Sequence, residues 1–215
     1  MDKQAILSRC DHTLLKPFST WKDMIPICED ALKYHTASVC IPPSFVKKAH
    51  ETYPELNICT VIGFPNGYNT TAVKVFEAKE AIREGALEID MVINIGAMKA
   101  GNYDFVEQEI AELREATRGK ILKVIVETCY LTEEEKIKVC ELVTNAGADF
   151  IKTSTGFGPA GATIEDINLF KKHIGPKVKM KAAGGISTVE DLEAFVDAGC
   201  ERIGTSRAIG LLKDQ

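Results

Sequence analysis

The chain has 215 residues, of which 45% are hydrophobic and 27% charged, with 16 glycines and 8 prolines. This composition excludes collagen-like, low-complexity and broadly disordered chains, and the length fits one globular domain over 1–215. The 26 basic and 31 acidic residues give a formal net charge of -5 and are mixed along the chain. The sequence has no basic stripe of the kind that binds phosphates, so we do not expect a nucleic-acid partner.

The seven cysteines form an odd set without a C-x-x-C pair, and the four histidines lack metal-ligand spacing. Neither a disulfide framework nor a metal site is predicted, and a reducing compartment, the cytoplasm, fits best. The sequence shows no signal-peptide pattern at its start and no run of about 18 apolar residues. We therefore expect neither export nor a membrane partner.

Short apolar runs alternate with longer amphipathic stretches along the chain, which predicts alternating strands and helices. Eight strands are expected, at Cys10–Leu14, Ser38–Ile41, Ile58–Gly63, Leu87–Ile93, Leu122–Glu127, Phe150–Ser154, Val178–Ala183 and Arg202–Thr205. Helices are expected at Thr20–Tyr34, Pro43–Tyr53, Thr71–Glu84, Tyr103–Thr117, Thr132–Asn145, Thr163–Lys172 and Thr188–Ala198. A C-terminal helix is expected after the last strand.

Local signals support these helices. Thr132 and Thr188 are each followed three residues later by an acidic residue, close to a capping box. Gly85, Gly147 and Gly199 are each expected to end a helix. They stand five residues before Asp90, Lys152 and Gly204 on the strands that follow. Repeated helix–glycine–strand junctions predict a parallel sheet covered by helices, and eight of them predict a single-domain (β/α)8 barrel. An open doubly wound sheet is the alternative, although no G-x-G-x-x-G turn follows the first strand.

Charged residues interrupt otherwise apolar strands at four places. Asp90 lies in Glu-Ile-Asp-Met-Val-Ile-Asn, Lys152 in Phe-Ile-Lys-Thr-Ser-Thr-Gly and Lys181 in Lys-Met-Lys-Ala-Ala-Gly-Gly. Lys123 lies in Leu-Lys-Val-Ile-Val-Glu. Buried charges are costly unless paired, and the active sites of (β/α)8 barrels lie at the carboxyl ends of the strands. We expect these side chains to meet in one pocket, either as a reactive site or as a structural ion pair.

Two lysines and a carboxylate in a poorly solvated pocket suggest covalent chemistry. Only a neutral amine attacks a carbonyl, whereas an ordinary lysine, with a pKa of about 10.4, is almost fully protonated at pH 7. Burial and a second ammonium group both weaken proton binding. One lysine is therefore expected to form an imine, the other to activate it, and Asp90 to move protons.

Glycine-rich segments follow the last two expected strands, where (β/α)8 barrels frequently bind phosphate through backbone N–H groups. This pattern predicts a phosphorylated substrate. The candidate residues are Gly184, Gly185, Gly204, Thr205 and Ser206, with Thr155 and Gly156 on the neighbouring strand. Each glycine pair alone could equally serve a tight turn.

Two further polar positions are interpreted structurally. His12, on the first strand, is expected to be a hydrogen-bonded core residue. Cys40, in Ser-Val-Cys-Ile-Pro-Pro, is expected to be a small buried residue lining the barrel, since no histidine partner is evident.

Four motifs, in order along the chain, resemble those of the 2-deoxyribose-5-phosphate aldolases, a class I Schiff-base aldolase family. They are Asp-His-Thr-Leu-Leu at 11–15, Glu-Ile-Asp-Met-Val-Ile-Asn at 88–94, Lys-Thr-Ser-Thr-Gly at 152–156 and Lys-Ala-Ala-Gly-Gly-Ile at 181–186. The resemblance runs from about Asp11 to Ile209.

The resemblance implies reversible cleavage of 2-deoxy-D-ribose 5-phosphate into acetaldehyde and D-glyceraldehyde 3-phosphate, in deoxyribose phosphate catabolism, without metal or organic cofactor. It implies that Lys152 forms the Schiff base, Lys181 activates it and Asp90 is the acid–base carboxylate. Asp11, Cys40 and Lys123 match positions that support the substrate, and the glycine-rich segments match a phosphate site. Family members are commonly homo-oligomers, dimers or larger.

Some members of that family carry a basic residue after the Schiff-base strand, where this chain has Phe157. Part of the phosphate affinity is then missing or supplied elsewhere. Two rival functions fit the same residues. One is a phosphosugar isomerase or synthase that uses Asp90 as a general base, and the other is a non-catalytic barrel that binds a phosphorylated ligand.

Overall fold

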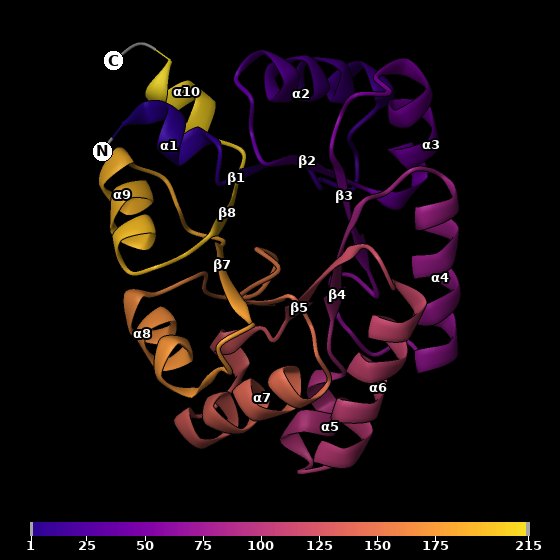
Figure 1. The fold of residues 1–215 in the computed structure, drawn as a ribbon, viewed down its shortest axis with the longest axis vertical. Coiled ribbons are helices and arrows are strands. Elements are labelled where there is room, and N and C mark those ends of the chain that lie inside the picture. Colours follow the sequence, from indigo (N-terminus) through magenta and orange to yellow (C-terminus); the bar gives the residue numbers. More distant parts are fainter. Residues whose placement is uncertain (1, 214–215) are drawn as a thin grey trace.

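The computed structural model describes residues 2–213, so three residues of the predicted domain, 1 and 214–215, lie outside it. Eight parallel strands form a closed barrel in sequence order, and β8 pairs with β1 to complete the ring (Figure 1). The (β/α)8 prediction is confirmed. The strands are β1 (Cys10–Thr13), β2 (Ser38–Ile41), β3 (Ile58–Ile62), β4 (Glu88–Val92), β5 (Ile121–Ile125), β6 (Phe150–Lys152), β7 (Lys179–Ala183) and β8 (Arg202–Thr205).

Helices surround the ring of strands (Figure 1). The predicted ones correspond to α2 (Trp21–Lys33), α3 (Pro43–Thr52), α4 (Thr71–Arg83), α6 (Tyr103–Ala116), α7 (Glu133–Asn145), α8 (Ile164–His173) and α9 (Val189–Asp197). The C-terminal helix is α10 (Ala208–Leu212). The short α1 (Lys3–Leu7), α5 (Ile95–Lys99) and 3-10 turn η1 (Thr128–Tyr130) were not predicted, because segments this short carry no readable apolar period.

The helix boundaries follow the predicted signals. Thr132 and Thr188 both form capping boxes with the acidic residue three positions later. Gly85, after α4, has a φ of 115°, and a Cβ there would lie 2.4 Å from the His50 ring. Only glycine fits that junction, for both conformational and steric reasons.

The apolar core fills the layer between the strands and the helices, and includes Met91 on β4, Ile110 on α6 and Val139 on α7. The barrel interior is different, because it holds buried charged side chains from β1, β4, β5, β6 and β7. Strand side chains alternate between these two environments. The fold therefore places its buried charges in the centre of the ring.

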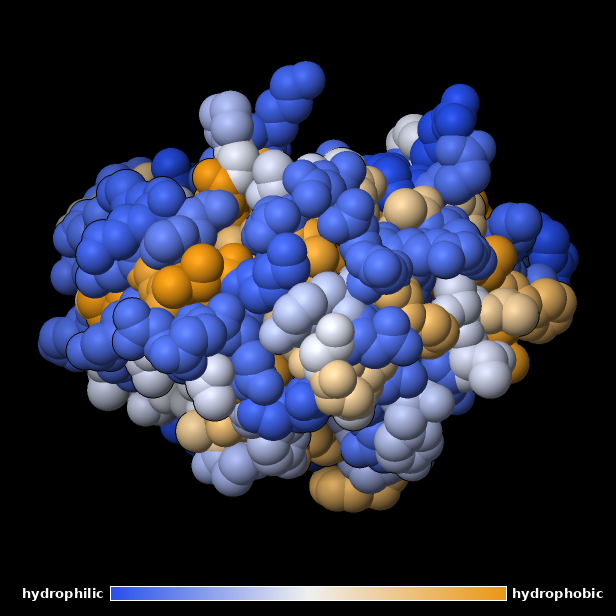
Figure 2. Space-filling model, turned by 90° about the horizontal axis from the view of Figure 1, so that it is seen from below, coloured by the Kyte–Doolittle hydropathy of each residue, from blue (hydrophilic) through white to orange (hydrophobic). Residues whose placement is uncertain are grey.

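The face of the molecule shown in Figure 2 is largely hydrophilic, with smaller apolar patches between the hydrophilic residues. This matches the amphipathic helices, which bury one face and expose the other. Within residues 2–213, every helix is too short or too polar to cross a lipid bilayer.

Candidate active site

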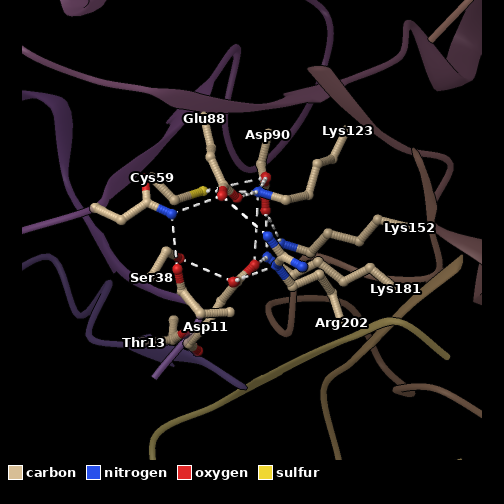
Figure 3. A network of polar contacts seen from close by, with 12 residues as sticks. Asp11, Thr13, Ser38, Cys59, Glu88, Asp90, Lys123, Lys152, Lys181 and Arg202 are labelled. Atoms are coloured by element: carbon tan, nitrogen blue, oxygen red, sulfur yellow. Dashed lines mark hydrogen bonds and ion pairs between the residues drawn. The ribbon is translucent and has the colours of Figure 1, made fainter. Parts of the chain in front are cut away.

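The four predicted charged residues meet at the centre of the barrel (Figure 3). Pairing aligns Asp90 with Lys123 on β5, and Lys152 with Lys181 on β7. Asp90 accepts hydrogen bonds from all three lysines: Oδ1 lies 2.8 Å from Lys123 Nζ, and Oδ2 lies 2.8 Å from Lys152 Nζ and 2.7 Å from Lys181 Nζ. Lys152 and Lys181 therefore share one carboxylate oxygen.

Two further carboxylates and one guanidinium surround this centre (Figure 3). Asp11 pairs with Lys181, and its Oδ2 lies 3.5 Å from Lys123 Nζ. Glu88 Oε2 lies 2.6 Å from Lys123 Nζ. Arg202 contacts both carboxylates, at 3.3 Å from Asp11 Oδ1 and 3.1 Å from Glu88 Oε1. The central network thus consists of three carboxylates and four cations: Asp11, Glu88, Asp90, Lys123, Lys152, Lys181 and Arg202.

Asp90, Lys123 and Lys181 hold one another ionised. Burial opposes ionisation of Asp90, but the ammonium groups around it, led by Lys123, hold its pKa well below the usual range. Burial likewise opposes the charged form of Lys181, yet Asp11 and Asp90 outweigh it and raise its pKa. The pKa of Lys123 is raised for the same reason, chiefly by Asp11 and Asp90 against burial. Lys181 is therefore a permanent positive charge beside Lys152.

A cavity of about 660 Å³ opens at the carboxyl ends of the strands, and Lys152 lines it. The predicted phosphate residues also line it, on the loops after β6, β7 and β8. They are Thr155, Gly156, Gly184, Gly185, Gly204, Thr205 and Ser206. The structure therefore brings the reactive lysine candidate and the whole predicted phosphate site to one cavity.

Close packing explains the presence of glycine at two positions of this site. A Cβ at Gly204 would lie 3.1 Å from both Lys181 Cε and Ala183 Cβ, so a side chain there would crowd the buried lysine. Gly184 has a φ of 80° and packs against the backbone of Gly161, in the loop after β6. The two loops that form this wall therefore touch backbone to backbone.

Glu127, just after β5, anchors the loop after β6. Its φ of 53° is left-handed, which is unusual for a residue with a side chain. Its carboxylate accepts hydrogen bonds from the Thr155 hydroxyl and from the Thr155 N–H, the latter at 3.2 Å. The Thr155 hydroxyl oxygen accepts from Phe157 N at 3.0 Å. The Thr155 hydroxyl hydrogen is therefore used within the protein.

The other predicted substrate residues lie beneath the cavity. Asp11, Cys40 and Lys123 are fully buried and do not line the cavity wall. Cys40 pairs in register with Cys59, and a hydrogen bond from Cys59 lowers the Cys40 pKa. Their placement fits support of the reactive groups, and direct contact with substrate stays a prediction.

Two groups of buried side chains have the composition of a metal site. They are Cys40, Cys59 and Asp90, and Asp11, Cys59 and Glu88, each with ligand atoms within 4.8 Å of one another. Lys123 Nζ already lies 3.3 Å from Cys59 Sγ, besides its contacts with Asp90 and Glu88. A lysine ammonium therefore supplies the positive charge that these ligands would otherwise offer to a metal.

Sequence reasoning missed several residues of the site. Glu88 and Arg202 each stand two positions before a residue that was identified, on the same strand and hence the same face. That spacing was a readable signal. Lys16 and Arg207, which line the cavity, lie in loops whose course the sequence does not define.

The prediction for His12 is half right. The side chain is buried, as expected, but neither ring nitrogen has a hydrogen-bond partner among residues 2–213, so the expected hydrogen bonding is wrong. Burial lowers the pKa of His12.

Comparison with known proteins assigns the family. The profile of the DeoC/LacD family aldolases matches residues 4–213. This chain belongs to the DeoC/LacD aldolase family. It is therefore an aldolase, an enzyme of the lyase class.

Curated relatives of this DeoC/LacD aldolase match over nearly their whole length. The deoxyribose-phosphate aldolase of Clostridium botulinum (strain Alaska E43 / Type E3) is 61% identical over 216 residues, covering 100% of this chain and 98% of the relative. That of Clostridioides difficile (strain 630) is 56% identical, covering 98% and 96% of the two chains.

Solved structures have the same fold. The aldolase QR15 superposes with a TM-score of 0.93 at 42% identity, over 97% of this chain and 95% of its own. A tetrameric deoxyribose phosphate aldolase from Aeropyrum pernix superposes with a TM-score of 0.92 at 28% identity, over 99% and 92% of the two chains.

Proposed function

We propose that this aldolase reversibly cleaves 2-deoxy-D-ribose 5-phosphate into acetaldehyde and D-glyceraldehyde 3-phosphate, through a Schiff base on Lys152. The observation that carries the proposal is the position of Lys152. Lys152 lines the cavity and belongs to a network in which Lys123 and Lys181 are fully buried and held charged. Of the three lysines around Asp90, a substrate aldehyde in the cavity therefore meets Lys152.

The first step joins substrate and enzyme covalently. The neutral amine of Lys152 attacks C1 of the open-chain sugar, and the carbinolamine loses water to give a protonated imine. Lys181 shares Asp90 Oδ2 with Lys152, so a buried positive charge lies beside the attacking amine. The imine then withdraws electrons from C2.

The second step breaks the C2–C3 bond. The C3 hydroxyl loses its proton through a water and the pair Asp90 and Lys181, and the bonding electrons pass to the imine to give an enamine. Because the pKa of Asp90 is held so low, this carboxylate passes a proton on rather than keeping it. Glyceraldehyde 3-phosphate leaves, C2 of the enamine is protonated, and hydrolysis releases acetaldehyde and Lys152.

The phosphate end of the substrate is bound by the loops after β7 and β8. The residues there that line the cavity with Lys152 include Gly184, Gly185 and Ser206. Binding the non-reacting end in this way positions C1 at the amine, which lowers the entropic part of the barrier.

The rival functions use the same residues without a covalent step. Neither rival accounts for a cavity lysine that shares a buried carboxylate oxygen with a second, fully buried lysine. An aldolase that forms an imine uses such a lysine as its nucleophile. This arrangement therefore favours the aldolase.

Reductive trapping tests the proposal directly. The protein is incubated with 2-deoxyribose 5-phosphate and sodium borohydride, and then analysed by intact mass and peptide mapping. We expect an adduct on the peptide that contains Lys152. A Lys152→Leu variant should give none and should lose at least about 10³-fold in cleavage rate, because it lacks the covalent step. A wild type without adduct under conditions of turnover would overturn the Schiff-base mechanism.

The setting of the reaction is part of the proposal. We place it in deoxyribose phosphate catabolism in the cytoplasm, and the seven cysteines, all free, fit a reducing compartment. A homo-oligomer, a dimer or larger, is proposed for the chain as well; the Aeropyrum pernix relative is tetrameric.

A further inference from the structure

The cavity is lined by positive charges without acidic residues. Within residues 2–213, three cations line it, Lys16, Lys152 and Arg207, and neither an aspartate nor a glutamate does. The chain as a whole has a formal charge of -5. The cavity lining is therefore positively charged, whereas the chain as a whole is negatively charged, and the cavity favours an anion.

Lys16 and Arg207 come from neighbouring loops. Lys16 lies three residues beyond the end of β1, and Arg207 lies two residues beyond the end of β8. Because β1 pairs with β8, these loops are adjacent at the rim of the barrel. The loop after β7, with Gly184 and Gly185, is the next one along the ring.

Both cations are free to bind a ligand. They are exposed, and neither makes an ion pair with a residue of the described chain. Lys16 Nζ stands 5.8 Å from the Phe18 ring centroid, and the Arg207 backbone N–H is fixed by Thr205 Oγ1 at 3.1 Å. The Arg207 backbone is thus held in place, while its guanidinium N–H groups donate to no acceptor among residues 2–213.

Neutral donors lie beside them. Gly156, Gly185 and Ser206 line the same cavity, and their backbone N–H groups donate to no acceptor within 2–213. The loop after β6, which carries Gly156, also adds Thr155 and Phe157, which carry no charge, and the Thr155 hydroxyl hydrogen is committed to Glu127. The charge to balance a phosphate dianion must therefore come from Lys16 and Arg207.

We propose that Lys16 and Arg207 are specificity-determining residues, which bind the phosphate dianion from the loops after β1 and β8 and make the enzyme prefer phosphorylated over unphosphorylated substrates. This inference rests on the proposed function and assigns its phosphate selectivity to two named side chains. Arg207 is the stronger partner, because a guanidinium can bind two phosphate oxygens at once, whereas lysine acts as a point charge.

The test compares two substrates and two pairs of variants. We measure kcat/KM for 2-deoxyribose 5-phosphate and for 2-deoxyribose with the wild type, Arg207→Ala and Lys16→Ala. The matched controls are Arg118→Ala and Lys177→Ala, exposed cations at the opposite end of the barrel, before β5 and β7. Binding of inorganic phosphate is measured separately by calorimetry.

We expect Arg207→Ala to lower the ratio of the two kcat/KM values at least tenfold, mainly through KM for the phosphorylated substrate. Lys16→Ala should lower it about threefold, and the controls should not change it. The affinity for inorganic phosphate should fall in the same order. The wild-type preference should also weaken as ionic strength rises, because the cations are exposed.

Two results would overturn the inference. One is an equal loss for both substrates, which would indicate a structural role, and the other is an unchanged ratio with unchanged phosphate binding. Failure of the proposed reaction would look different, since the wild type would then cleave neither substrate while phosphate binding still depended on Lys16 and Arg207.

Discussion

At the scale of single residues, the reactive centre depends on which lysine reaches the cavity. Lys123, Lys152 and Lys181 all contact Asp90, and all three are buried strand residues. Of these three lysines, only Lys152 lines the cavity. The sequence motifs placed the three lysines together, but their depth in the barrel depends on strand lengths and tilt, which spacing alone does not define.

The buried His12 makes the free energy of unfolding depend on pH. Burial holds its pKa in the folded protein below the ordinary value of 6.5. Below about pH 6.5 the unfolded chain therefore binds a proton that the folded chain does not, and the free energy of unfolding falls as the pH is lowered. A single proton changes it by at most about 1.4 kcal/mol per pH unit.

We expect His12→Phe to flatten this dependence between pH 6.5 and 5, because phenylalanine does not titrate. Chemical denaturation of both proteins at several pH values checks it. His173→Phe, at the exposed end of α8, is the matched control. Equal slopes for the wild type and His12→Phe would contradict the assignment.

At the scale of elements, a second buried ion pair ties the helices to the ring. Lys74 on α4 contacts Glu109 on α6 at 2.7 Å and donates to the Val92 carbonyl at the end of β4, at 2.8 Å. Glu109 also accepts from Asn94 N, where α5 begins, at 2.9 Å. These contacts fix the loop after β4, which directly follows the strand that carries Asp90.

A double-mutant comparison tests this pair. Lys74→Met should reduce the free energy of unfolding by about 3–5 kcal/mol, because it leaves the Glu109 carboxylate buried without its partner. Lys74→Met with Glu109→Leu should recover much of that loss, since no uncompensated charge remains. Urea denaturation gives the values. A double variant that is less stable than Lys74→Met would contradict this account.

The elements that sequence reasoning recovered are those with a strong local signal. Amphipathic helices of 9 to 14 residues with caps, such as α7 and α9, were predicted close to their ends. The turns that shape the cavity were not, because the left-handed backbone of Glu127 follows from its contacts with Thr155. The sequence also does not show that Lys74 lies on a buried helix face, because a lysine in a helix normally marks the face exposed to solvent.

At the scale of the whole molecule, the central network joins strands from around the ring. Lys123 alone contacts Asp11 on β1 and both Glu88 and Asp90 on β4. A closed barrel has no free edge, so the loss of an ion pair at its centre affects strands around the whole ring. The barrel should therefore be more sensitive to loss of Lys123 than to loss of an ion pair between its outer helices.

We expect Lys123→Met to cost about 3–5 kcal/mol, which corresponds to a fall in Tm of roughly 6–20 °C for a protein of this size. Lys136→Met breaks a partly exposed pair with Asp166 and should cost much less. Scanning calorimetry of the two variants gives the Tm values, and equal falls in Tm would contradict the central role of Lys123.

The unequal numbers of charges in the network have a consequence for the intermediates of the mechanism that we propose. Four cations face three carboxylates when Lys152 is counted among the cations. The proposed iminium on Lys152 keeps that surplus of one positive charge. In the enamine the same nitrogen is neutral, so the buried charges balance once the hydroxyl proton has left to solvent. Repulsion among the buried cations therefore favours the enamine over the iminium and lowers the barrier to breaking the carbon–carbon bond, while the overall equilibrium is unchanged.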